Sequence, residues 1–366
     1  MLLVVALVVV FLSLSNGSND NFKGVATIYG SGSASYRVCL AWATITTLAG
    51  SLLALILAAG LVKTFSAKGL VPDAVASSPT FLAAAALGAA STVLLATRLG
   101  FPVSTTHALT GALVGAGFVC AGSAVNLGVL GKTFFLPLLL GPVIAVVIVT
   151  CAYPLARSLR RGLGVERHSC VCVAGTWTPL AAVDGQATAA PGSPAVVSCD
   201  ARDRYLGTLF GLTAQRALDG LHFVSAGAVG FARGLNDTPK IVAIIIAAKA
   251  LPANTGLAVA AFAMVLGGLL GARRVAETMS KKITTLNAGQ GFVANVTAAT
   301  LVLLASLKGL PVSTTHVTTG GIFGIGLVNR SARWAAVTQI LLAWLITLPT
   351  GAALGALALY ALRRFA

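Results

Sequence analysis

The sequence predicts an all-α polytopic membrane protein built from two inverted repeats of about five membrane segments each. Its composition is the first reason: of 366 residues, 57% are hydrophobic and only 9% are charged, with a mean hydropathy of +0.92. A soluble domain carries about 25% charged residues, so most of this surface must face lipid. The second reason is a series of long apolar segments, and the third is a pair of polar motifs that occurs once in each half of the chain.

Six apolar segments are long enough to cross a bilayer, which takes about 20 residues for a hydrocarbon core of about 30 Å. They are residues 37–62, 80–96, 134–156, 255–272, 290–307 and 334–362. The first apolar run, residues 2–14, lacks a small-residue cleavage pattern after it. We therefore expect a membrane segment there rather than a signal peptide.

A hydrophilic segment, residues 157–204, divides the chain into a first transmembrane repeat, 1–156, and a second, 205–366. The sequence GSNDNFKGVATI at 17–28 resembles GLNDTPKIVAII at 234–245, and PVSTTH occurs at both 102–107 and 311–316. The first pair of motifs is separated by 217 residues and the second by 209. One small insertion or deletion reconciles the two offsets, which indicates a duplicated protein.

The distribution of Lys and Arg predicts that the second repeat is inverted. If each half crosses the membrane five times and segment 157–204 lies in the cytoplasm, 14 of these residues fall inside and 7 outside. This bias has the sign of the positive-inside rule, and parallel repeats would lose it. The same rule explains the net charge of +16. We therefore expect a lipid bilayer around the protein and no nucleic acid bound to it.

Each Asn-Asp motif is predicted to break a helix. The apolar run before the first motif, residues 2–15, is too short to span, and Gly, Asn, Asp and Pro in both motifs favour a break. Non-helical backbone inside a membrane is tolerated only where it lines a cavity or is buried in protein. Two interrupted segments at corresponding places in two halves are typical of a transporter binding site.

Each PVSTTH motif is predicted to start a new helix, because the proline ends the preceding one and the hydroxyl residues suit the cap and first turn. The six hydroxyl residues are Ser104, Thr105, Thr106, Ser313, Thr314 and Thr315. Hydroxyls and free amides at the positive end of a helix dipole form an anion site. If the repeats are inverted, the two ends meet near the midplane. Simple capping is the alternative, but recurrence of the whole string beside a second repeated motif favours a binding function.

Asp20 and Asp237 would each cost about 2.5 to 3.5 kcal/mol at the centre of a membrane helix, so they need a reason to be there. Lys23 and Lys240 follow three residues later, so one interpretation is a pair of ion pairs that serve folding alone. The other has the Asn-Asp side chains bind a small cation, with sodium as the first candidate. These side chains are Asn19, Asp20, Asn236 and Asp237. A carboxylate could also accept a hydrogen bond from the protonated oxygen of HPO4(2−), and sulfate lacks that donor.

Other polar features have weaker functional interpretations. His107 and His316 could relay protons or act as structural donors. Cys170, Cys172 and Cys199 match none of the standard paired zinc spacings, so we expect free thiols. GKT at 131–133 lacks the earlier glycine of a Walker A loop, which excludes that ATP site. No nucleophile with a base and an orienting group is evident, so we do not expect an enzyme.

The twin PVSTTH strings, GSNDNFKG, GLNDTPK and the hydrophilic segment between the halves resemble the inorganic phosphate transporter (PiT) family, the sodium-dependent phosphate symporters and permeases, over nearly the whole chain. The resemblance implies inverted repeats, a central phosphate site and cation-coupled uptake, with the family's Asn-Asp and hydroxyl positions falling on the residues named above. In many members small residues follow the first Asn-Asp, whereas Asn21, Phe22 and Lys23 stand here. A lysine amine could replace a cation beside Asp20, which leaves sodium and proton coupling both open.

The resulting hypothesis is a phosphate importer in the inner (plasma) membrane of a bacterium, working by alternating access, with a homodimer as a candidate assembly. A sulfate or other oxyanion permease of the same fold is one alternative, and a passive anion channel is another. A sensor or scaffold is disfavoured because the sequence contains no recognisable cytoplasmic domain.

Overall fold

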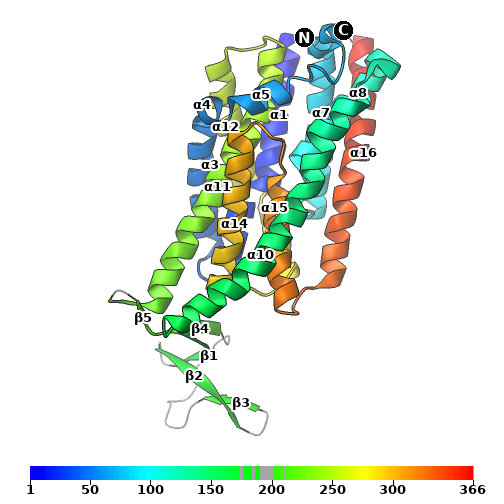
Figure 1. Cartoon of the computed structure of the whole chain (residues 1–366). Coiled ribbons are helices and arrows are strands. Elements are labelled where there is room, and N and C mark those ends of the chain that lie inside the picture. Colours follow the sequence, from blue (N-terminus) through cyan, green and yellow to red (C-terminus); the bar gives the residue numbers. More distant parts are fainter. Residues whose placement is uncertain (174–175, 184–185, 190–201, 210, 366) are drawn as a thin grey trace.

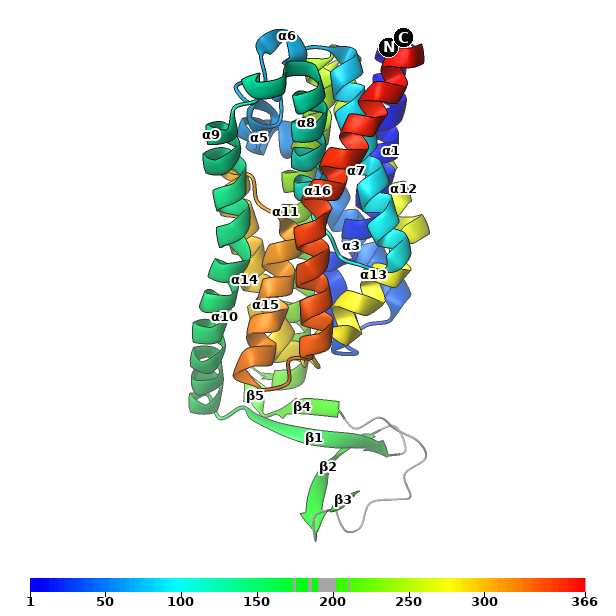
Figure 2. The same ribbon diagram turned by 90° about the vertical axis from the view of Figure 1, so that its right-hand side faces the viewer.

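Long helices running side by side form most of the molecule, and a small β-sheet projects from one end (Figures 1 and 2). The computed structural model describes residues 1–173, 176–183, 186–189, 202–209 and 211–365. Both chain ends lie at the end of the bundle opposite the sheet. The charged side chains at the centre of the sequence motifs are buried between the helices.

The first half contains the long helices α1 (Leu2–Asp20), α3 (Tyr36–Leu52), α7 (Pro79–Leu99), α8 (Thr105–Ala121) and α10 (Leu136–Gly162). The second half contains α11 (Ala214–Ala247), α12 (Ala253–Gly271), α14 (Ala288–Leu307), α15 (Thr314–Val328) and α16 (Trp334–Phe365). Short helices and turns join them: η1 (Lys23–Val25), α2 (Ala26–Gly30), α4 (Ala54–Leu57), α5 (Ala59–Thr64), α6 (Asp73–Ala76), η2 (Gly122–Ala124), α9 (Leu127–Val129), η3 (Leu130–Phe135), α13 (Arg273–Glu277) and η4 (Thr278–Lys282).

Seven segments within the described residues are long and apolar enough to cross a membrane. They are Leu2–Gly30, Pro79–Leu99, Thr105–Ala124, Leu127–Gly162, Ala253–Gly271, Ala288–Leu307 and Trp334–Arg364. The chain is therefore a multi-pass membrane protein, and its large exposed apolar side chains on α10 and α16 are suited to contact lipid.

The helices of the two halves pack in corresponding pairs. Helix α1 packs on α7 and α12, while α11 packs on α14 and α3. The last helix of each half crosses to the other half, since α10 packs on α15 and α16 packs on α8. Glycines make the second contact close: a Cβ on Gly115 would lie 2.0 Å from the carbonyl oxygen of Ala352, and one on Gly351 would lie 2.5 Å from that of Ala108. Small residues of this kind let membrane helices approach closely.

The first Asn-Asp motif interrupts its helix, but the prediction of a second break is wrong. Helix α1 ends at Asp20 and the chain resumes as η1, where Gly24 lies against the backbone of Gly230. Helix α11 instead continues through Asn236, Asp237 and Pro239 to Ala247. A proline within a helix removes one backbone hydrogen bond, and the buried apolar run after Pro239 packs well enough for the helix to continue.

The expectation of an all-α chain is also wrong, because part of segment 157–204 forms strands. Helix α10 extends to Gly162, and then β1 (Glu166–Val173), β2 (Thr176–Val183), β3 (Gln186–Ala189) and β4 (Arg202–Leu206) form an antiparallel sheet in the order β3-β2-β1-β4. A two-stranded pair, β5 (Thr208–Leu209) and β6 (Leu212–Thr213), precedes α11. Short strands need no long apolar run in the sequence. A search of the sequence for spanning helices therefore does not detect these strands.

The predicted span 37–62 is likewise shorter than expected, because α3 ends at Leu52 and α4 and α5 follow as separate turns. Other boundaries follow local signals. Ser35 and Ser78 accept the amides of Val38 and Phe81 as N-caps, and Gly100 ends α7 in the left-handed conformation with φ 77°.

Candidate functional site

The two PVSTTH motifs place the N-termini of α8 and α15 at the centre of the site. Helix α8 begins at Thr105, and the Ser104 hydroxyl oxygen accepts the His107 amide at 3.1 Å. Helix α15 begins one residue after Ser313, whose hydroxyl oxygen accepts the His316 amide at 3.2 Å. The helix starts that the sequence predicts are present at both motifs, and their first amides have no acceptor within the helix.

These two helix ends lie against each other. The Thr315 hydroxyl donates to the carbonyl oxygen of Val103 at 2.7 Å, and the Thr106 hydroxyl donates to that of Val312 at 3.3 Å. The six hydroxyl residues predicted for the site are all at most 5% exposed. Residues about 209 positions apart in the sequence therefore form one buried polar cluster, which we call the hydroxyl cluster.

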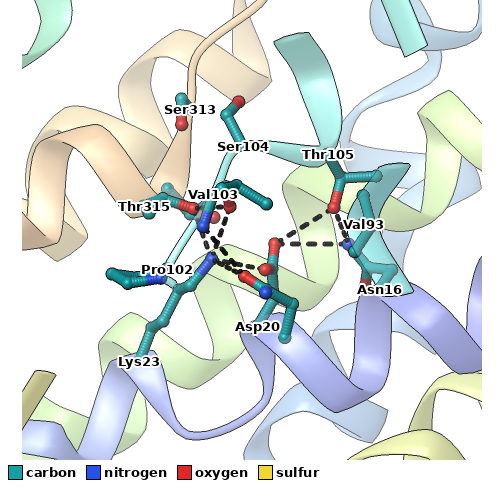
Figure 3. Close-up of polar contacts among 12 residues, drawn as sticks. Asn16, Asp20, Lys23, Val93, Pro102, Val103, Ser104, Thr105, Ser313 and Thr315 are labelled. Carbon is teal, nitrogen blue, oxygen red and sulfur yellow. Dashed lines mark hydrogen bonds and ion pairs between the residues drawn. The ribbon is translucent and has the colours of Figure 1, made fainter. Parts of the chain in front are cut away.

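The two carboxylates lie beside this cluster and share a partner. The Asn16 amide nitrogen donates to the Thr105 hydroxyl at 2.9 Å, to Asp20 Oδ2 at 3.3 Å and to Asp237 Oδ2 at 3.4 Å. Thr105 also donates to Asp20 Oδ2, at 3.4 Å. Figure 3 shows Asn16, Asp20 and Thr105 facing one another. One amide thus connects the two Asn-Asp motifs to the first helix end.

Each carboxylate is paired with buried cations. Asp20 forms an ion pair with Lys23, and Asp237 Oδ1 lies 3.5 Å from Lys240 Nζ. Asp237 Oδ2 also lies 3.6 Å from Arg233 Nε. These five residues are all 1% to 2% exposed. Counted at formal charge, three basic and two acidic side chains sum to one positive charge in the interior, which favours an anion nearby.

The asparagines of the motifs mainly hold the surrounding backbone. The Asn19 amide nitrogen donates to Thr97 Oγ1 at 2.9 Å and to the Phe101 carbonyl oxygen at 3.0 Å, and its Oδ1 accepts the Val103 amide at 3.1 Å. Asn236 donates to the Val312 carbonyl oxygen at 3.2 Å. Both asparagines therefore fix the extended segments that lead into α8 and α15.

The oxygens proposed for a cation lie close together, but a lysine amine lies among them. Lys23 Nζ donates to Asn19 Oδ1 at 3.0 Å and also contacts Asp20 Oδ1. Lys240 has the equivalent place beside Asp237. Within the described residues no cluster of three or more His, Cys, Asp and Glu side chains could hold a metal ion, and Cys199 lies outside those residues.

From the sequence, we assigned no role to Asn16 or Arg233. Arg233 is among the largest fully buried side chains, and its guanidinium donates to Asn16 Oδ1, to Asn21 Oδ1 at 3.3 Å and to Thr47 Oγ1 at 3.3 Å. The two residues occupy corresponding positions, because they are separated by the same 217 residues as Asn19 and Asn236. The repeat places an asparagine in one half opposite an arginine in the other, and this correspondence in the sequence could have indicated both residues.

Comparison with known proteins identifies similar chains in other organisms. A protein of Pyrococcus abyssi described by name as a phosphate permease is 28% identical over 387 residues, with 93% of each chain covered. One of Mycobacterium tuberculosis, described as a low-affinity inorganic phosphate transporter, is 27% identical over 97% of this chain and 76% of its own.

A solved structure called the sodium-dependent phosphate transporter matches the whole chain with a TM-score of 0.75 at 20% identity, which shows a shared fold. These relatives are transporters and permeases rather than enzymes. The sequence model of the phosphate transporter family matches residues 16–355, a range that includes both Asn-Asp motifs and both PVSTTH motifs. The chain therefore belongs to the phosphate transporter family.

Proposed function

We propose that this chain is a secondary active transporter that imports inorganic phosphate, coupled to a sodium or proton gradient, by alternating access around the hydroxyl cluster. One observation carries the proposal: two hydroxyl-rich helix N-termini from opposite halves meet beside buried charges that sum to one positive charge. Helix amides, hydroxyls and a positive field together suit a tetrahedral oxyanion.

The substrate-binding residues in this proposal are the hydroxyl cluster and the two carboxylates: Ser104, Thr105, Thr106, Ser313, Thr314, Thr315, Asp20 and Asp237. The Ser104 and Ser313 hydroxyls and the first amides would donate to phosphate oxygens. The Thr105, Thr106 and Thr315 hydroxyls would donate to them after rotating away from their present acceptors. Asp20 Oδ2 has only long contacts, 3.3 Å and 3.4 Å, so it retains capacity to accept a hydrogen bond. A protonated phosphate oxygen supplies that donor and sulfate does not, which supports phosphate as the substrate.

The buried state of the cluster supports alternating access. Ser104 and Ser313 are 1% and 2% exposed, so an ion reaches them only when helices move. On the predicted cytoplasmic side, a cavity of about 870 Å³ is lined by Arg98, Arg274 and Thr97 among others. Because the Thr97 hydroxyl accepts the Asn19 amide, this basic cavity adjoins the first Asn-Asp motif and suits phosphate release.

The architecture in this proposal is two inverted repeats, 1–156 and 205–366, separated by segment 157–204 on the cytoplasmic side of the inner membrane. The opposite directions of α1 and α11 in Figure 1 support the inversion. The reciprocal packing of α10 and α16 on the other half is consistent with a two-fold relation between the repeats. If sodium is the coupling ion, the oxygens that would hold it are those of Asn19, Asp20, Asn236 and Asp237.

Uptake of labelled phosphate into proteoliposomes tests the proposal, with an inward sodium gradient, an inward proton gradient or neither, and with unlabelled sulfate as competitor. We expect uphill accumulation driven by a gradient and resistant to sulfate. Gradient-independent flux would support a passive anion channel, and inhibition by sulfate would support a broader oxyanion permease. Cross-linking in intact membranes tests the predicted homodimer.

A further inference from the structure

The amine of Lys23 lies inside a shell of four oxygens. It donates to the carbonyl oxygen of Val103 at 2.8 Å and to Asn19 Oδ1 at 3.0 Å, and it contacts Asp20 Oδ1 and Thr315 Oγ1. Figure 3 shows the amine pointing between α1 and the segment before α8. The side chain is 1% exposed, so protein atoms rather than water surround the amine.

Lys240 has a matching environment in the other half. Its amine donates to the carbonyl oxygen of Val312 at 2.8 Å and to Thr106 Oγ1 at 2.7 Å, with Asp237 Oδ1 at 3.5 Å. Each lysine thus contacts the aspartate of its own motif, the backbone carbonyl before one PVSTTH serine, and a threonine hydroxyl from the opposite half.

Carbonyl, carboxylate and hydroxyl oxygens of this kind hold sodium in membrane transporters, typically at unwound backbone and at the negative C-terminal ends of helices. Val103 lies in an extended segment, and Asp20 is the last residue of α1. The oxygen set fits a small cation, yet a covalently attached ammonium already lies within it.

On the basis of the proposed function, we propose that Lys23 and Lys240 are tethered cations that fill these two positions, so that the chain transports phosphate without binding sodium at its Asn-Asp motifs. The number of buried charges beside the hydroxyl cluster also supports this proposal. The five buried charged side chains already provide one net positive charge beside the anion site. Two additional sodium ions would place three net positive charges in a region of low dielectric, which is unfavourable in the absence of the anion.

Phosphate uptake in sodium chloride and in choline chloride, at equal pH, ionic strength and membrane potential, tests the proposal. Wild-type uptake should differ by less than about twofold between the two salts, which corresponds to a free-energy difference below about 0.5 kcal/mol. Lys23→Ala should lose about 100-fold in choline because Asp20 is left unpaired, and should recover at least about tenfold in sodium. Lys132→Ala, at an exposed lysine, is the matched control and should behave like the wild type in both salts.

A second measurement needs no variant and no transport. The melting temperature of the purified wild-type protein should not change when sodium replaces choline, whereas that of Lys23→Ala should rise in sodium. Sodium-dependent uptake or sodium-dependent melting of the wild type would overturn the proposal. So would a folded Lys23→Ala protein that sodium neither stabilises nor activates. If the wild type transports no phosphate in any salt, the proposed function fails, and the melting measurement still decides whether the lysines replace sodium.

Discussion

Replacing Arg233 with methionine should destabilise the protein more than any exposed arginine substitution. Methionine has a similar volume but no charge, so the change removes the ion pair with Asp237 and the donors to Asn16, Asn21 and Thr47. Among the residues that the structure describes, Asp237 then retains Lys240, at 3.5 Å, as its one cationic partner. Removing one member of a buried ion pair lowers the free energy of unfolding by about 3 to 5 kcal/mol, and we expect a decrease in this range for Arg233→Met.

A double-mutant cycle separates the ion pair from the packing. The double variant Arg233→Met with Asp237→Asn contains no Asp237 carboxylate that lacks its arginine partner. Its loss of unfolding free energy should therefore be smaller than the sum of the two single losses by about 1 to 3 kcal/mol. Unfolding by sodium dodecyl sulfate in mixed micelles, followed by far-ultraviolet circular dichroism, measures all the variants. Arg364→Met, at an exposed position, is the control. Additive losses, or a single variant as stable as the control, would refute the ion-pair reasoning.

Three further substitutions test the site and the fold. Ser104→Ala should weaken phosphate affinity by about 1 to 3 kcal/mol, or roughly 5-fold to 150-fold, measured as the phosphate concentration for half-maximal uptake; an unchanged value would remove Ser104 from the site. Asp20→Asn should abolish uptake or change its cation dependence while the amount of protein in the membrane stays normal, and parental transport would contradict the assignment. Gly351→Ala should destabilise the α8–α16 contact by about 1 to 3 kcal/mol because its Cβ would lie 2.5 Å from the Ala108 carbonyl oxygen, whereas Gly131→Ala, with open space around it, should not.

The membrane class and the helix starts at PVSTTH were predictable because hydropathy and capping are local properties. The small residues on α8 were visible in the sequence, but their partner was not. Only the packed structure brings Gly111 and Gly115 to α16, in the other half of the chain. Local signals also misled at GLNDTP, where Pro239 looks like a break but lies in a continuous α11.

The composition of the candidate site was predictable, and its connections were not. The motifs identified both aspartates and the hydroxyl residues, which the structure brings together. The bridging by Asn16 depends on tertiary packing, since it connects three residues from three different helices. The placement of each lysine amine beside the threonine of the opposite half has the same origin.

The exchange of α10 and α16 between the halves has a consequence for biosynthesis. The face of α8 that carries Gly111 and Gly115 is covered by α16, which is synthesised more than 200 residues later. Domains made on the ribosome usually fold in order from the N-terminus. We therefore expect the packing of the first half to be completed only after α16 is made, so that the two halves mature as one cooperative unit rather than in succession.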